Sequence, residues 1–145
     1  IHAYVLGEHG DSSFIPWSIT NIAGIPMEEY CEDQEHADLD EDEIIEEVHK
    51  AGAEVIKRKG ATFYAIAMSV NKICDSILRD ANNIITVSTL MDGRYGISDV
   101  CLSLPAVLGS NGIEREVSPK LADEEVAKLQ NSAKALRSVI DQLEF

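Results

Sequence analysis

The sequence predicts an α+β domain in which antiparallel strands pack with long helices. Two helical segments precede the clearest strands, and a third helix closes the chain. Between them, three β-rich runs are separated by short turn sequences, which is the pattern of an antiparallel meander. Strands and helices are therefore partly segregated, whereas a doubly wound α/β protein alternates them. We expect residues 1–145 to form a single domain.

Composition and charge exclude two classes of partner. The 145 residues are 45% hydrophobic, which is enough for a buried core, and their formal net charge is −14. This charge argues against binding to a nucleic-acid backbone and against attraction to anionic lipid. No apolar run approaches the roughly 18 residues of a membrane span. We therefore expect neither a nucleic-acid partner nor a membrane partner.

Cysteine usage indicates the compartment. The three cysteines, Cys31, Cys74 and Cys101, are odd in number and widely spaced. This pattern is typical of reduced, mostly buried thiols rather than of a disulfide framework. We therefore expect a cytoplasmic protein.

The N-terminal part contains two extended segments. Residues 2–9 are rich in β-branched and aromatic side chains and end at glycines, which predicts a strand that enters a turn. Residues 19–26 form a second extended piece, closed by Gly24 and Pro26. Because the chain begins with Ile1 and already has strand character there, we expect a fragment of a longer protein.

Two helices are predicted next. Asp40 and Glu43 have the spacing of a capping box, and acidic residues in a first turn favour the positive end of the helix dipole. Apolar residues then recur at helical spacing at positions 44, 45, 48, 51, 55 and 56. A second helix follows Gly60, and we expect it to be central and largely buried because its apolar face is almost continuous.

The meander and the last helix complete the chain. Residues 84–90, 99–109 and 113–118 are predicted strands, separated by the hairpin signals at 91–96 and 110–112. The last helix carries apolar residues at positions 126, 129, 133, 136, 140 and 143. Asp123 is its expected cap, and Lys134 and Arg137 lie toward its negative end.

The acidic run could suggest a calcium loop. Residues 38–49 place oxygen ligands at alternate positions, as an EF-hand loop does. Glu43 stands where that loop needs glycine, and His49 stands where it needs a bidentate glutamate. A solvated helix start fits better, and a non-catalytic acidic interaction or calcium-binding module remains an alternative function.

His9 is the candidate catalytic residue. Histidine is the side chain that exchanges a proton near neutral pH, and the glycines at positions 7 and 10 allow close approach of backbone and substrate. From the pattern alone, a proton-transfer catalyst and an ordinary loop histidine both remain open.

Residues 7–12, GEHGDS, resemble the active-site segment of the NAD-dependent L-lactate dehydrogenases, G-E-H-G-D-[ST]. Residues 59–67 (KGATFYAIA), residues 86–115 and the closing helix resemble the same family in the same order, and the bacterial enzymes more than the animal ones. The resemblance covers essentially all 145 residues, and it implies the C-terminal, substrate-binding half, with the fold of the lactate/malate dehydrogenase C-terminal domain. No G-x-G-x-x-G follows a strand, so the Rossmann domain that binds the dinucleotide is absent from this chain.

The resemblance implies roles for three residues. His9 matches the acid that protonates the ketone oxygen of pyruvate as hydride arrives, and the base in the reverse reaction. Thr62 matches a threonine that lines the substrate pocket, and Ile66 matches a residue that packs against the nicotinamide of NAD. Without the family, a helix N-cap and a core position would be preferred for Thr62 and Ile66.

His2 raises the possibility of regulation. It matches the histidine that binds fructose 1,6-bisphosphate at a subunit interface in allosteric bacterial lactate dehydrogenases. The family also implies a fermentative, glycolytic enzyme that forms homotetramers or dimers. Its carboxylate-clamping arginine, histidine-orienting aspartate and mobile-loop arginine have no match here, so we expect the isolated chain to be inactive. Malate dehydrogenase of the same family remains an alternative, because the loop that selects the substrate is absent; ATFYAIA (61–67) favours lactate dehydrogenase.

Overall fold

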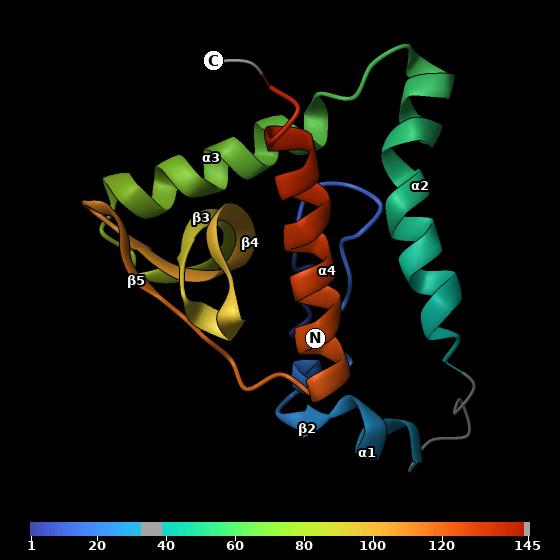
Figure 1. The fold of residues 1–145 in the computed structure, drawn as a ribbon. Coiled ribbons are helices and arrows are strands. Elements are labelled where there is room, and N and C mark those ends of the chain that lie inside the picture. The colour runs from blue at the N-terminus through green and yellow to red at the C-terminus, as the bar shows by residue number, and fades with distance from the viewer. Residues whose placement is uncertain (33–38, 144–145) are drawn as a thin grey trace. The chain divides into compact units, whose positions relative to one another are not determined.

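The computed structural model describes residues 1–32 and 39–143. Figure 1 shows the helices and strands along the chain. The chain divides into two compact units. The first unit comprises Ile1–Leu39, Thr86–Pro105 and Ser118–Phe145, and the second comprises Asp40–Ile85 and Ala106–Val117. Antiparallel strands and long helices are both present, which confirms the predicted α+β class.

The meander is also confirmed. Strands β3 (Asn83–Asp92), β4 (Ser98–Gly109) and β5 (Gly112–Glu116) form one sheet in the order β3-β4-β5. A short 3-10 turn, η2 (Arg94–Gly96), connects the first two strands. Strands β4 and β5 are antiparallel, with Val107 opposite Arg115 and a shift in register after Val107. The two turn sequences therefore lie where the hairpin signals predicted them.

The core of the first unit lies between the strands, the N-terminal segment and helix α4 (Asp123–Ile140). Because side chains alternate along a strand, Val100, Leu102 and Leu104 of β4 all face this core. Leu129 of α4 is fully buried with them. Complete burial of one such side chain contributes about 1.5–3 kcal/mol to stability. This core fixes α4 relative to the N-terminal segment that carries His9.

The N-terminal segment differs from the predicted strand. Instead of one ladder, residues 2–9 make isolated bridges to three partners, His2 with Asn21, Leu6 with Phe14, and Gly7 with Ser103. Gly7 has φ +101°, which is outside the range of a regular strand and interrupts pairing. The segment is thus extended, but its hydrogen bonds go to different parts of the unit.

Residues 17–32 contain more local structure than the sequence indicated. The predicted extended piece is a small hairpin of β1 (Asn21–Ile22) and β2 (Ile25–Pro26), preceded by η1 (Trp17–Ile19). A short helix, α1 (Met27–Glu32), follows it and was not predicted. Two acidic residues in its first turn are consistent with a helix start. Because many more acidic residues follow in the sequence, these two did not mark a helix start.

Helix α2 (Glu41–Lys59) begins the second unit as predicted. Asp40 is its N-cap, because Oδ1 accepts a hydrogen bond of 2.9 Å from the Glu43 amide. Gly60 ends the helix with φ +79°. Residues 41–49 are helical, so this segment does not form an EF-hand loop; Asp38, its first position, lies outside the described residues. Within the described ranges, no cluster of three or more potential metal ligands occurs.

Helix α3 (Tyr64–Leu78) is present, but the expected burial is wrong. Ser76 is its only buried residue, whereas Ile66 is 59% and Met68 is 69% exposed. Near its C-terminal end, Asn83 Nδ2 of β3 donates to Ser76 Oγ at 3.0 Å. The apolar side of α2 is similar, since none of its residues is buried. Both helices therefore present apolar faces that the described part of their unit does not cover.

Two smaller expectations need correction. The N-cap of α4 is Ala122, and Asp123 is the first helical residue. Glu125 replaces the cap side chain, because its carboxylate accepts a hydrogen bond of 2.9 Å from the Ala122 amide. The cysteines are free thiols, but Cys74 and Cys101 are exposed. Cys101 points outward because its neighbours in β4 on both sides face the core.

Among residues 1–32 and 39–143, no helix has the length and apolar character needed to cross a bilayer.

Candidate functional site

The loop at residues 7–13 carries His9. The bridge between Leu6 and Phe14 closes its base, with reciprocal amide-to-carbonyl hydrogen bonds of 2.9 and 3.0 Å. A second bridge joins Gly7 to Ser103 of β4. At the far end, the Ser13 amide donates to the Gly10 carbonyl at 3.1 Å and forms a tight turn. His9 therefore lies between a closed base and a closed turn, on a loop of defined conformation.

A ring of polar groups supports this loop from α4. The Glu8 amide donates to Ser132 Oγ at 2.7 Å, and the Ser12 hydroxyl donates to Glu8 Oε1 at 2.6 Å. The two serine oxygens are 3.0 Å apart, which completes the ring. We call this set, Glu8, Ser12 and Ser132, the serine–glutamate ring. It holds the backbone on the N-terminal side of His9 and the turn on its C-terminal side.

The imidazole of His9 is exposed, in contrast to the backbone around it. None of the described residues forms a hydrogen bond with it. The loop thus presents a histidine whose backbone is fixed and whose ring nitrogens remain available for an external group. This arrangement suits proton transfer to a bound molecule, since a general acid or base must reach the reacting atom.

His2 lies in the same unit at the other end of the segment. Its backbone pairs with Asn21 through hydrogen bonds of 2.8 and 3.0 Å, and its side chain is exposed. The segment just before Asn21 is bonded to α4, because Glu125 accepts hydrogen bonds from both the amide (3.0 Å) and the hydroxyl of Ser18. Glu125 is 4% exposed, so this carboxylate is one of the few buried charges in the described residues.

Thr62 and Ile66 belong to the second unit. Thr62 is half-buried and precedes Phe63, the N-cap of α3, so it is not a helix cap itself. Its hydroxyl makes no hydrogen bond with the residues that the structure describes. Ile66 lies one helical turn later and is 59% exposed, so it is not a core residue. The structural alternatives for both residues are therefore wrong, and both side chains are accessible to a ligand.

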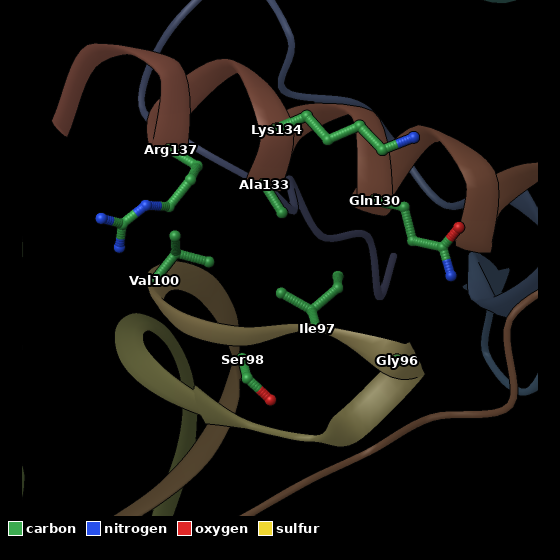
Figure 2. A pocket seen from close by; sticks show the side chains of 8 residues that line it. All are labelled: Gly96, Ile97, Ser98, Val100, Gln130, Ala133, Lys134 and Arg137. Carbon is green, nitrogen blue, oxygen red and sulfur yellow. The ribbon is translucent and has the colours of Figure 1, made fainter. Parts of the chain in front are cut away.

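A pocket of about 330 Å³ lies in the first unit, and neither His9 nor His2 lines it (Figure 2). Figure 2 shows Ile97, Val100 and Ala133 between Arg137 at one end and Gln130 at the other. The polar groups at both ends are engaged within the protein. Arg137 Nη2 lies 2.6 Å from Asp141 Oδ1, and Gln130 Nε2 donates to the Tyr95 carbonyl at 2.8 Å. The Arg137 and Gln130 side chains of the lining are therefore both bonded to other residues of the unit.

Tyr95 joins the β3–β4 turn to the segment before α4. Its hydroxyl donates to the Pro119 carbonyl at 2.6 Å. Burial raises the pKa of this phenol, and the charge of Arg94 acts in the opposite direction. Tyr95 thus has a structural role in the unit that holds the His9 loop.

The GEHGDS motif identifies His9, but it does not identify the α4 residue that holds the His9 loop. Ser132 is fully buried in the apolar stripe of α4, between Leu129 and Ala133. A serine in a buried helical position needs a hydrogen-bond partner, and this requirement was the available signal. The identity of that partner could not be predicted, because Glu8 and Ser132 are 124 positions apart.

Known proteins resemble the chain over its whole length. Residues 1–144 match the model of the lactate/malate dehydrogenase α/β C-terminal domain. An L-lactate dehydrogenase of Acetivibrio thermocellus is 45% identical over 147 residues, which cover 100% of this chain and 46% of that enzyme. The chain thus spans about half the length of such relatives.

Solved structures show the same relationship. A lactate dehydrogenase from a Medee basin deep-sea metagenome library superposes with a TM-score of 0.91 at 38% identity, over 97% of this chain and 45% of that one. A malate dehydrogenase from Archaeoglobus fulgidus, solved in complex with NADH, has a TM-score of 0.84 at 38% identity, over 99% of this chain and 44% of that one. The fold, the motif around His9 and these matches lead to one conclusion: the chain belongs to the lactate/malate dehydrogenase family and forms its α/β C-terminal domain.

Proposed function

We propose that this chain is the C-terminal, substrate-binding part of an NAD-dependent L-lactate dehydrogenase, which interconverts (S)-lactate and pyruvate. The proposal rests on the exposure of the His9 side chain and on the way its loop is held. Its imidazole is exposed and makes no hydrogen bond with the described residues, while its loop is held by the serine–glutamate ring. A histidine presented in this way, within the motif GEHGDS, fits the acid/base of the reaction.

The proposed chemistry requires one proton at one atom. Reduction of pyruvate adds a hydride to the carbonyl carbon and leaves negative charge on the oxygen. Protonated His9 would give its proton to that oxygen, and neutral His9 would remove the hydroxyl proton of lactate in the reverse direction. Bound NADH would supply this hydride, and bound NAD⁺ would accept it in the reverse reaction. The fixed backbone of the loop sets the direction from which the imidazole approaches the substrate.

Thr62 and Ile66 would complete this chain's share of the site. The Thr62 hydroxyl has no partner among the described residues, so it is available to a polar group of a short 2-oxo acid. The exposed, apolar side chain of Ile66 fits contact with the face of a nicotinamide ring. The dinucleotide itself would be held mainly by an N-terminal domain, because no phosphate-binding glycine motif occurs in this chain.

The same proposal accounts for the exposed helices. We infer that the chain is one domain of a longer polypeptide, and that the apolar faces of α2 and α3 pack against the rest of that polypeptide or a second subunit. A cytoplasmic homodimer or homotetramer fits this inference. His2, with an exposed side chain on a paired backbone, is proposed to contact fructose 1,6-bisphosphate at a subunit interface.

The alternative substrate is oxaloacetate. A malate dehydrogenase with 38% identity has the same fold over 99% of this chain, so the fold does not separate the two activities. His9 would have the same role in either enzyme. Residues 61–67 favour pyruvate in the comparison with the family's motifs.

The test uses the longer polypeptide that contains this chain. NADH oxidation is followed with pyruvate and with oxaloacetate, each with and without fructose 1,6-bisphosphate. The proposal predicts a strong preference for pyruvate, and stimulation by the sugar bisphosphate that a His2→Gln variant loses. Preference for oxaloacetate would assign malate dehydrogenase activity instead, and turnover of neither substrate would overturn the proposed activity.

A further inference from the structure

We infer that Ser132 is a positioning residue for the proton transfer assigned to His9, and this inference rests on the proposed function. Ser132 lies on α4, far from the GEHGDS motif in sequence, and does not belong to it. Its side chain is fully buried and contacts the loop on both sides of His9. The relevant partners are the Glu8 amide and the Ser12 hydroxyl.

The number of protons defines the direction of the hydrogen bonds in the ring. Each serine hydroxyl has one proton to donate and two lone pairs that accept. Ser12 gives its proton to the Glu8 carboxylate at 2.6 Å, which is a short, charge-assisted bond. Across the 3.0 Å between the two serine oxygens, the proton must then come from Ser132. Ser132 accepts from the Glu8 amide at 2.7 Å and donates to Ser12, so each hydroxyl proton of the ring has one acceptor.

The ring also explains two positions of the motif that the reaction does not use. Glu8 and Ser12 flank His9, and each contributes a side-chain atom to the ring. A threonine at position 12 would provide the same hydroxyl, which accounts for the [ST] position of the motif. The glutamate and the serine thus act on the loop, whereas the histidine between them has an exposed side chain.

The ring fixes the position of the loop backbone relative to α4. It therefore also fixes the position of the His9 imidazole. Without the Ser132 hydroxyl, the Glu8 amide loses its partner and the Ser12 hydroxyl loses its donor. The loop would keep its closed base but would no longer be attached to α4 at its tip. A displacement of about 1 Å at a catalytic group reduces the rate by up to about 100-fold.

The test compares Ser132→Ala with a matched buried serine. Ser76 in α3 is also fully buried; its hydroxyl donates to the Lys72 carbonyl at 2.9 Å and accepts from Asn83 at 3.0 Å. Ser76→Ala removes the same atom from a helix and disturbs no part of the His9 loop. Three quantities are measured in the longer enzyme: kcat with pyruvate, Kd for NADH and the unfolding midpoint in urea. In the 145-residue chain, hydrogen exchange of the Glu8 amide is measured by NMR.

We expect Ser132→Ala to lower kcat about 10- to 100-fold with NADH affinity within about 3-fold of wild type. We expect the Glu8 amide to exchange at least about 10-fold faster, since its acceptor is gone. Ser76→Ala should lose comparable stability and keep kcat within about 2-fold. A Ser132→Ala variant with unchanged kcat would overturn the positioning role, even where stability falls.

A His9→Gln variant separates this result from failure of the proposed function. If His9→Gln abolishes turnover while Ser132→Ala retains it, the proposed function stands and the positioning role is wrong. If His9→Gln has no effect on turnover, the proposed function is wrong and the positioning role falls with it.

Discussion

The backbone of Gly7 lies directly against the side chain of Ser132. A Cβ atom at position 7 would lie 2.7 Å from Ser132 Oγ and 3.2 Å from Ser132 Cβ. Gly7 also has φ +101°, a conformation that side chains with a Cβ rarely adopt. The first residue of the GEHGDS motif is therefore glycine for two independent reasons, its backbone conformation and its close contact with Ser132 of α4.

Gly7→Ala should destabilise the protein by more than about 1 kcal/mol, because the new methyl group is strained in its backbone and collides with Ser132. The midpoint of urea unfolding measures this loss. Gly52→Ala is the control, since nothing lies within 4 Å of a Cβ there. Gly52 is inside α2, so alanine should stabilise by up to about 1 kcal/mol. Equal stability of the two variants would contradict the close contact at Gly7.

Glu125→Gln should destabilise the first unit by about 1–3 kcal/mol. The two carboxylate oxygens accept three hydrogen bonds, two from Ser18 and one from the Ala122 amide. Glutamine keeps one acceptor oxygen, but its NH₂ group would face donors that the second carboxylate oxygen now accepts from. Glu124→Gln, an exposed neighbour in the same turn, should change stability by less than about 0.5 kcal/mol. Urea unfolding compares the two variants, and an equally small effect of Glu125→Gln would show that the buried carboxylate is not needed.

Tyr95→Phe should cost about 0.5–1.5 kcal/mol, since the hydrogen bond to the Pro119 carbonyl is lost. It should also change the dependence of stability on pH. Burial raises the pKa of Tyr95 above 10.0 in the folded state, so above this pH the unfolded chain loses the proton first. The contribution of Tyr95 to the free energy of unfolding is therefore complete below about pH 10, and it decreases as the pH rises further.

Urea unfolding between about pH 9 and pH 11 measures this effect. The Tyr95→Phe variant should lose less stability over that range than the wild type. Tyr64→Phe is the control, because Tyr64 is 70% exposed and should leave the alkaline slope as in the wild type. Identical slopes for Tyr95→Phe and the wild type would contradict a raised pKa at Tyr95.

Local patterns predicted much of this fold, for physical reasons. Helical periodicity identified α2, α3 and α4, and turn residues identified the meander, since both report on interactions between residues close in sequence. Burial of α3 could not be predicted from its apolar face, because burial depends on what covers a surface. The isolated bridges of the N-terminal segment were missed for the same reason, as Gly7 pairs with Ser103 rather than with a neighbour in sequence.

In the candidate site, too, local sequence patterns predicted some features and contacts between distant residues could not be predicted. The motif identified His9, but the group that attaches its loop to α4 is Ser132, which sequence patterns place in an apolar stripe. Contacts between residues 124 positions apart leave no local signal. The roles of Thr62 and Ile66 rest on the resemblance to the family, and their accessibility in the second unit is consistent with those roles.

The most direct test of the central claim is the turnover of pyruvate by a His9→Gln variant of the longer enzyme. Stopped-flow mixing measures the rate of NADH oxidation, and fluorescence of NADH measures its binding to the same variant. Our account predicts a loss of about 100- to 10,000-fold in rate, the contribution of a general acid, with NADH binding unchanged. His49→Gln, on α2, should leave the rate within about 2-fold of wild type. A His9→Gln enzyme that oxidises NADH at the wild-type rate would contradict the assignment of His9 as the proton donor.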